Sequence, residues 1–299
     1  MFDHIRCFRQ PSTISEAIKL LQGREGEACL VAGGTDVALR VGRSVQVLVD
    51  VSRLGLSYIR RNGGRLHIGA TTTMASLEQS VLVRLTANGI LAQAAAICGS
   101  PQTRNMATIG GNLANASPAA DTATPLLVMG AEVVLQGLRS TRTLPLEEFF
   151  AGPHSTNSHR ELLVEVVIPR SRPKTTFSFL RLARTEIDIA LVAAAVSLRR
   201  DAKQRCAGVR IALGAVAPCP MRARRAEAVL EGQLATDKLI RQAAEIASQE
   251  IAPITDVRAS SEYRREIAQV LTRRAIEECV QRQVQESSLE AGSRNGGAR

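Results

Sequence analysis

The sequence predicts an α+β protein of two domains, and three observations support that class. Its 299 residues are long for one domain and comfortable for two. Helix-like and strand-like segments alternate over the first 172 residues. After Arg172, long strand-like segments come first and only helical patterns follow them. We therefore expect one domain over residues 1–172 and a second over residues 173–285.

The first domain is expected to open with an α/β unit, over about residues 1–54. Ser12 or Thr13 can cap a helix that has Glu16 in its first turn and Gly23 as a stop signal. A short apolar strand over 28–34 ends in a pair of glycines, and a second strand covers 45–52.

The rest of that domain, residues 55–172, reads as a mixed second subdomain. Asn62-Gly63 predicts a tight hairpin turn, and Asn88-Gly89 predicts a break between two helices. The expected elements are a hairpin over 57–73, helices over 76–99, a helix, turn and strand over 124–137, a short helix over 144–153 and a strand over 161–170.

The second domain is expected to combine long strands with a group of helices. A polar turn over 200–205 joins the strand segments, and residues 286–299 are small and polar, which predicts a disordered tail. The expected elements are strands over 177–200 and 206–223 and helices over 224–232, 235–251 and 260–284.

Composition excludes several classes of function. The formal charge is +10, but all except four of the 38 basic residues are Arg, and they are dispersed with no aromatic residues between them. This argues against nucleic-acid binding and leaves open either a docking face for an acidic protein or a merely solvated surface. The six Cys form no CxxC and the four His form no HxxxH, so no metal site is expected. No apolar run is long enough to span a membrane or serve as a signal sequence, which predicts a cytoplasmic protein.

Two pairs of glycines, Gly33-Gly34 and Gly110-Gly111, are the main candidates for chemistry. Paired glycines let the chain turn tightly and point consecutive N–H groups into one concavity, which binds anionic oxygen such as phosphate. Each pair by itself could equally be an ordinary tight turn. Neither pair fits the GxGxxG or GK[ST] patterns, so a dinucleotide would need a different fold.

The segments around these pairs carry a resemblance. "AGGTD" (32–36) and "TIGGNLANASPAAD" (108–121) resemble the paired diphosphate motifs of the FAD-binding medium subunit of molybdenum hydroxylases, the carbon monoxide dehydrogenase and xanthine dehydrogenase type. "FRQPSTISEAIKLL", "SPQTRNMATIGGN" and "FLRLARTEIDIALV" are similar to other parts of that family, so the resemblance covers about residues 1–285. It implies a two-subdomain FAD-binding domain of the p-cresol methylhydroxylase type, followed by a C-terminal domain with a small antiparallel sheet and a helix bundle.

The resemblance also implies the residues of an FAD site. Asp121 would bond hydroxyls on the flavin side, or cap the following helix, or both. Leu163 would lie beside the cofactor or simply in the core. Arg181 or Arg184 could contact the flavin edge, with a surface role as the alternative. The implied binding residues are Ala32, Gly33, Gly34, Thr35, Asp36, Thr108, Ile109, Gly110, Gly111, Asn112, Ser117, Asp121 and Leu163.

In such a family the redox chemistry belongs to the cofactor, so no catalytic acid or base is expected in this chain. The resemblance implies an electron-transfer subunit that takes electrons from an iron–sulfur small subunit and passes them to an external acceptor. A molybdopterin large subunit would complete the complex, typically a dimer of heterotrimers. The alternatives are a stand-alone flavin reductase of the same superfamily and a structural subunit without flavin.

Overall fold

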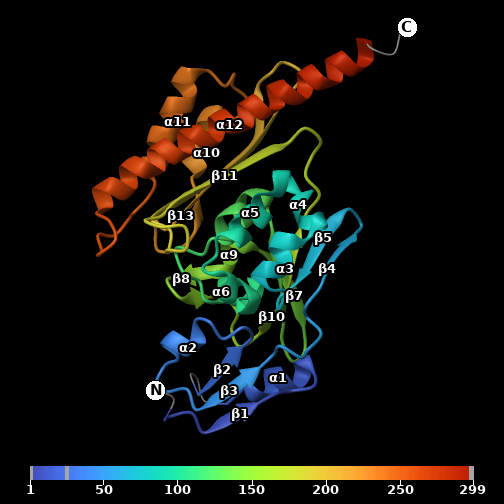
Figure 1. The fold of residues 1–299 in the computed structure, drawn as a ribbon, viewed down its shortest axis with the longest axis vertical. Helices are drawn as coiled ribbons and strands as arrows, with labels where there is room; N and C mark the ends of the chain where they lie inside the picture. The colour runs from blue at the N-terminus through green and yellow to red at the C-terminus, as the bar shows by residue number, and fades with distance from the viewer. Residues whose placement is uncertain (1–2, 24–26, 296–299) are drawn as a thin grey trace.

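The computed structural model describes residues 3–23 and 27–295, with side chains up to residue 285. Its three larger sheets follow one another along the long axis of the molecule, in chain order from bottom to top of Figure 1. We call these parts the N-terminal lobe (β1 to β3), the middle lobe (β4 to β10) and the C-terminal lobe (β11 to α12).

The N-terminal lobe is a parallel sheet with strand order β1-β3-β2. The predicted helix start is confirmed, because Thr13 accepts from the N–H of Glu16 (3.2 Å) and Glu16 accepts from the N–H of Ser12 (2.9 Å). The elements are β1 (Cys7–Arg9), α1 (Ile14–Leu20), β2 (Ala28–Val31), α2 (Val37–Arg40) and β3 (Val47–Asp50).

The middle lobe is an antiparallel sheet with strand order β4-β5-β10-β6-β7. Alternate residues such as Leu66, Ile68, Val133 and Leu135 are buried, so one face of the sheet carries the core. The strands are β4 (Ile59–Asn62), β5 (Arg65–Gly69), β6 (Glu132–Gln136), β7 (Thr141–Pro145) and β10 (Leu162–Ile168), beside a ribbon of β8 (Phe150–Gly152) and β9 (Ser155–Thr156).

Short helices supply the other side of that core (Figure 1). Asn88 and Gly89 both have positive φ, which confirms the predicted break between two helices. The helices are α3 (Met74–Gln79), α4 (Val81–Arg84), the 3₁₀ turn η1 (Ala87–Gly89), α5 (Ile90–Ala96), α6 (Pro101–Met106), α7 (Ile109–Ala114), α8 (Ala123–Met129) and α9 (Leu146–Phe149).

The hairpin predicted at Asn62-Gly63 forms, but its turn lies one residue further along. Asn62 pairs with Arg65, and the two residues with positive φ are Gly63 and Gly64. A tight hairpin turn needs positive φ at both central positions, and Gly adopts it without strain, so the Gly-Gly pair takes the turn.

The C-terminal lobe is an antiparallel meander covered on one face by three helices (Figure 1). Its other face adds residues such as Phe177, Phe179 and Ala195 to the core of the middle lobe. The elements are β11 (Thr176–Leu182), β12 (Val192–Arg200), β13 (Cys206–Gly214), β14 (Met221–Arg222), α10 (Arg224–Leu230), α11 (Asp237–Gln249) and α12 (Ser261–Asn295).

Further segments differ from their sequence predictions, among them the strand expected over 177–200, which is interrupted between β11 and β12. The tail expected to be disordered from residue 286 is helical to Asn295, because an established helix adds one hydrogen bond for each further residue; residues 296–299 lie outside the described residues. The segment around Gly110-Gly111, expected as a loop, is the short helix α7. Its start is fixed by the hydroxyl of Thr108, which caps the first turn.

Candidate functional site

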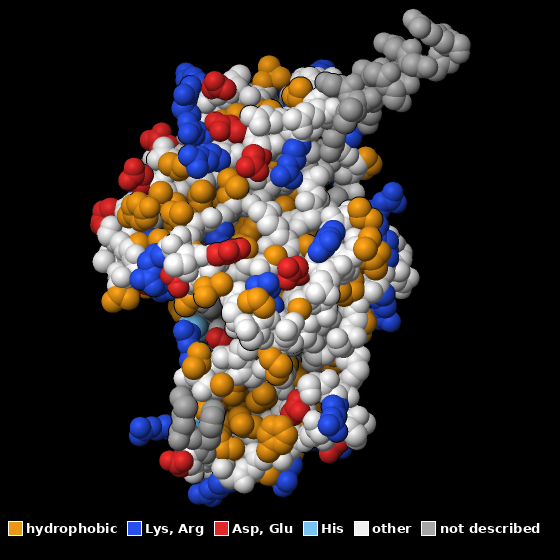
Figure 2. Space-filling view, viewed as in Figure 1, with side chains coloured by type: hydrophobic (Ala, Val, Ile, Leu, Met, Phe, Trp, Pro, Cys, Tyr) orange, Lys and Arg blue, Asp and Glu red, His pale blue; other side chains and the backbone are white. Residues whose placement is uncertain are grey.

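A cavity of about 920 Å³ lies between the N-terminal and middle lobes, where the surface in Figure 2 is recessed. That volume is in the upper range for sites of small molecules and cofactors. Its lining comes mainly from the turn after β2 with α2, the end of β5, α7 with the loop that follows it, the β8–β9 ribbon, residues 158–163 leading into β10, and the loop between β11 and β12. The C-terminal lobe therefore contributes to the rim of a cavity built mainly by the other two.

The turn after β2 forms the first wall, which we define as residues 32–36. Gly34 has a φ of +69°, which lets the chain reverse between β2 and α2. A Cβ on Gly33 would lie 1.7 Å from the carbonyl oxygen of Met106, so only glycine lets the turn pack on α6. Among hydrogen bonds between described residues, none uses the N–H groups of residues 33–36. Four consecutive donors thus remain available to an anion.

The second wall runs from Thr108 to Asp121, and its N–H groups are already used. Ile109 donates to the carbonyl of Thr72 (3.0 Å), and Gly110 donates to that of Ala70 (2.8 Å). Gly111 donates to the Thr108 hydroxyl (3.1 Å). The prediction of a backbone anion site is therefore wrong for this pair of glycines. In the first turn of this capped helix the backbone N–H groups bond to acceptors of the chain itself, so they are not available to a ligand.

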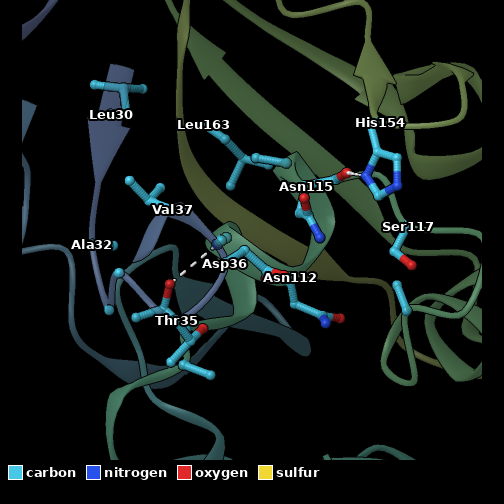
Figure 3. A pocket seen from close by; sticks show the side chains of 18 of the residues that line it. Leu30, Ala32, Thr35, Asp36, Val37, Asn112, Asn115, Ser117, His154 and Leu163 are labelled. Carbon is cyan, nitrogen blue, oxygen red and sulfur yellow. Dashed lines mark hydrogen bonds between the residues drawn. The ribbon is translucent and has the colours of Figure 1, made fainter. Parts of the chain in front are cut away.

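The structure brings together all of the predicted site residues except one. Ile109 is fully buried in the core of the middle lobe and does not line the cavity. The side chains of Thr35, Asn112, Ser117 and Leu163 lie around the cavity in Figure 3. The predicted residues that line it are Ala32, Gly33, Gly34, Thr35, Asp36, Thr108, Gly110, Gly111, Asn112, Ser117, Asp121 and Leu163.

Asp121 is buried and paired with an arginine of the C-terminal lobe. Its Oδ1 lies 2.9 Å from Nε of Arg181, whose side chain is 7% exposed. Burial raises the pKa of Asp121 to about 6, although the Arg181 charge acts in the opposite direction. The surface role considered for Arg181 is wrong. Asp121 is not the cap of the next helix either, because Thr122 occupies that position.

An arginine and a histidine that the sequence did not single out also line the cavity. His154 Nδ1 lies 2.9 Å from the carbonyl oxygen of Asn115 (Figure 3), and since a carbonyl only accepts, Nδ1 donates. The other ring nitrogen then accepts from Arg40 of α2 (3.2 Å). Together these contacts join α2 to Asn115 of the second wall. The pair of Arg40 and His154 left no sequence signal, because the two residues are far apart in the chain.

Thr71 was missed as well. Its side chain lines the cavity and is 7% exposed, and its buried hydroxyl has no hydrogen-bond partner among the described residues. Leaving such a group unpaired costs about 1–3 kcal/mol, so it indicates a ligand or water at this point. The only signal in the sequence is its place in the polar run "TTT" after β5.

These features fit FAD. The free N–H groups of the first wall suit a diphosphate, the unpaired Thr71 hydroxyl offers a donor, and a Cβ on Gly111 would fill open cavity space next to the Thr108 hydroxyl. Within residues 3–23 and 27–295, no group of three or more His, Cys, Asp or Glu could hold a metal ion. Nor is any helix of that part long and apolar enough to cross a membrane.

Comparison with protein families gives two matches that together span nearly the whole chain. Residues 3–171 match the FAD binding domain in molybdopterin dehydrogenase. Residues 177–279 match the CO dehydrogenase flavoprotein C-terminal domain.

Curated relatives match this chain over nearly their full length. The xanthine dehydrogenase FAD-binding subunit of Escherichia coli O157:H7 is 31% identical over 289 residues, covering 94% of this chain and 97% of the relative. The carbon monoxide dehydrogenase medium chain of Hydrogenophaga pseudoflava is 31% identical over 275 residues, covering 90% and 95%.

Solved structures confirm the predicted fold class. A carbon monoxide dehydrogenase chain from Hydrogenophaga pseudoflava superposes with a TM-score of 0.86 at 32% identity, covering 91% of this chain and 96% of that one. Quinoline 2-oxidoreductase from Pseudomonas putida 86 gives a TM-score of 0.82 at 30% identity, covering 92% and 96%. The resemblance found in the sequence is thus confirmed, and the chain belongs to the FAD-binding medium subunits of the molybdenum-containing hydroxylases, as an oxidoreductase component that binds FAD.

Proposed function

We propose that this chain is an electron-transfer subunit whose cavity holds the FAD. The single observation that carries this proposal is the unpartnered run of N–H groups at residues 33–36, opening into a cavity of about 920 Å³. Bound FAD supplies the step between single-electron donors and a two-electron acceptor. The chain's own part is to bind, orient and shield that group.

We propose these roles for the site residues. The N–H groups of residues 33–36 hold the diphosphate, and the exposed Arg40 guanidinium adds positive charge at the same wall. The side chains of Thr35, Asn112 and Ser117 add hydrogen-bonding groups from both walls. Leu163 gives apolar contact from β10, and the Asp121 carboxyl, paired with Arg181, binds cofactor hydroxyls.

The partners follow from the relatives, whose names describe subunits of larger enzymes. We propose an iron–sulfur small subunit as the electron donor, a molybdopterin large subunit as the site of substrate oxidation, and assembly as a dimer of heterotrimers. The acceptor is external to the complex, and the complex is cytoplasmic. We further propose that residues 1–172 fold as the FAD-binding domain, with subdomains over about 1–54 and 55–172, and that residues 173–285 form the second domain.

A visible spectrum of the purified chain tests this function. The expected result is a yellow protein with stoichiometric FAD that is reduced by substrate only after the iron–sulfur and molybdenum subunits are added. Reduction by substrate with the chain alone would instead support a stand-alone flavin reductase. A colourless chain that cannot be reconstituted with FAD would overturn the proposal.

The location of FAD is tested by Gly111→Val. The new side chain projects toward the cavity, where the nearest atom outside its own helix backbone is the Thr108 hydroxyl at 3.0 Å. We expect loss of FAD from a folded protein. The matched control is Gly137→Val, at the β6–β7 turn, a glycine that does not itself line the cavity and where a Cβ meets nothing closer than 3.5 Å. Equal FAD content in both variants would place the cofactor elsewhere.

A further inference from the structure

The loop between β11 and β12, residues 183–191, brings apolar side chains of the C-terminal lobe to the rim of the cavity. Ile187, Asp188 and Ile189 line the cavity. Ile187 is 59% exposed and Ile189 is 49% exposed, although both are large apolar residues. Such exposure leaves an apolar surface beside a site that binds a large, partly aromatic ligand.

The side chain of Arg181 donates hydrogen bonds to two backbone carbonyls of this loop. Its Nη1 donates to the carbonyl of Glu186 (3.2 Å), and its Nη2 donates to the carbonyl of Asp188. Its Nε faces Asp121 across 2.9 Å, on the second wall of the cavity. One planar guanidinium thus joins two loop carbonyls to a carboxylate of another lobe, a geometry that the fork of Arg allows and Lys does not.

The other polar contacts of the loop stay within the C-terminal lobe. The N–H of Asp188 donates to the carbonyl of Thr185 (3.3 Å), and Arg184 Nε donates to the Asp188 carboxylate (3.2 Å). Among the hydrogen bonds and ion pairs between described residues, the one that ties the loop to the cavity wall runs through Arg181 and Asp121. Burial makes this contact stronger than the exposed Arg184 pair, which solvent screens.

We propose that Arg181 is a positioning residue that holds the 183–191 loop against the cavity, so that Ile187 and Ile189 form an apolar cover over the bound FAD. The inference rests on the proposed function, because it needs FAD in this cavity. The cover excludes water from the cofactor and slows its release. Asp121 supports it by fixing the guanidinium, in addition to any contact that it makes with FAD itself.

The test uses the full chain freed of FAD, with two readouts that do not depend on enzyme activity. One is FAD affinity by fluorescence titration. The other is the rate of cleavage after Glu186, an exposed residue of the loop, by a glutamate-specific protease. Arg181→Met should weaken FAD binding about 10- to 100-fold, the range for losing hydrogen bonds to a charged group, and should speed cleavage at Glu186 severalfold.

Two further variants separate positioning from a general loss of stability. Arg181→Lys keeps the charge beside Asp121 but cannot reach both loop carbonyls, so it should restore the free energy of unfolding more than it restores FAD affinity. Arg184→Met removes an exposed ion pair of the same loop and should keep FAD affinity within about twofold.

The outcomes are distinguishable. If Arg181→Met fails to fold, Ile187→Ser replaces it, since this exposed side chain can change without disturbing the core; weaker FAD binding then supports the cover, and unchanged binding overturns it. If the wild-type chain binds FAD, and Arg181→Met binds it with the same affinity and is cleaved at Glu186 at the same rate, the role proposed for Arg181 is wrong but the proposed function stands. If the wild-type chain binds no FAD, the proposed function fails as well.

Discussion

The two glycine pairs have the same sequence but different surroundings. Gly33-Gly34 lies in an open turn whose N–H groups are free, whereas Gly110-Gly111 lies in a capped helix whose N–H groups are bonded to the chain. Within each pair, however, the division of work is alike. The first glycine lets two segments approach closely, and a Cβ on the second would meet only one side-chain atom.

This comparison shows that a Gly-Gly motif can require glycine for two different reasons: one glycine for packing, and the other for backbone conformation or ligand space. Gly33 and Gly110 are required by backbone atoms of neighbouring segments, so they serve the fold. Gly34 is required by its positive φ, and Gly111 leaves space that the ligand can use. A substitution at Gly33 or Gly110 therefore tests packing, one at Gly34 tests the backbone conformation, and one at Gly111 tests the site.

The largest effect is expected for Gly33→Ala. Its Cβ would meet the carbonyl oxygen of Met106 at 1.7 Å, so the turn after β2 must move away from α6. We expect a loss of about 3 kcal/mol or more in the free energy of unfolding, together with loss of FAD, because the free donors move with the turn. Chemical denaturation and FAD content measure the two effects. Wild-type values for both would contradict the role assigned to Gly33.

The next largest effect is expected for Asp121, at the end of the second wall. Asp121 is buried, whereas Asp36 of the first wall is half-buried. Burial raises the pKa of Asp121 from 3.8 to about 6, so the folded state binds this proton more tightly than the unfolded chain. That contribution to stability is complete below pH 4 and is lost as the pH rises through 6.

Asp121→Asn removes this titration. The free energy of unfolding of the wild type, minus that of the variant, should fall by about 2–3 kcal/mol between pH 4 and pH 7. Urea unfolding of both proteins at the two pH values gives this difference and cancels the other titrating groups. A difference that is constant with pH would mean that Arg181 keeps Asp121 ionised throughout.

Gly110→Ala should have a smaller effect than Gly33→Ala. Its Cβ would lie 2.6 Å from the carbonyl oxygen of Ala70, but the better helix preference of Ala offsets part of the strain. We expect about 2 kcal/mol of destabilisation by denaturant unfolding, with FAD still bound when the ligand is in excess. Loss of FAD from a fully folded variant would show that Gly110 serves the site rather than the packing.

The smallest effect is expected for Gly34→Ala. Space is available, since the nearest atom to a Cβ is Val31 Cγ1 at 3.6 Å, so the penalty is that of a φ of +69°. This costs roughly 1 kcal/mol for Ala and less for Asn, which tolerates the left-handed region better. Comparing the stabilities of Gly34→Ala and Gly34→Asn by thermal unfolding measures the cost of the positive φ at this position. Equal stability of both variants would argue for a steric cause instead.

Local patterns in the sequence predicted most of the helices and strands. The cap formed by Thr13 and Glu16 lies within four residues of chain, so its signal is complete in the sequence. The helix α7 was missed because Gly-Gly and Asn disfavour helices, and its stability comes from Ile109 packing in the core and from the Thr108 cap.

The sequence by itself determined the family, the two-domain α+β class and two of the segments that line the cavity, around residues 32–36 and 108–121, because their motifs are contiguous in the chain. The tertiary structure decided which N–H groups stay free, that Ile109 turns into the core, and that Arg181 meets Asp121. These outcomes depend on atoms contributed by segments far apart in sequence. Their competition for hydrogen bonds and space is resolved only when the lobes pack together.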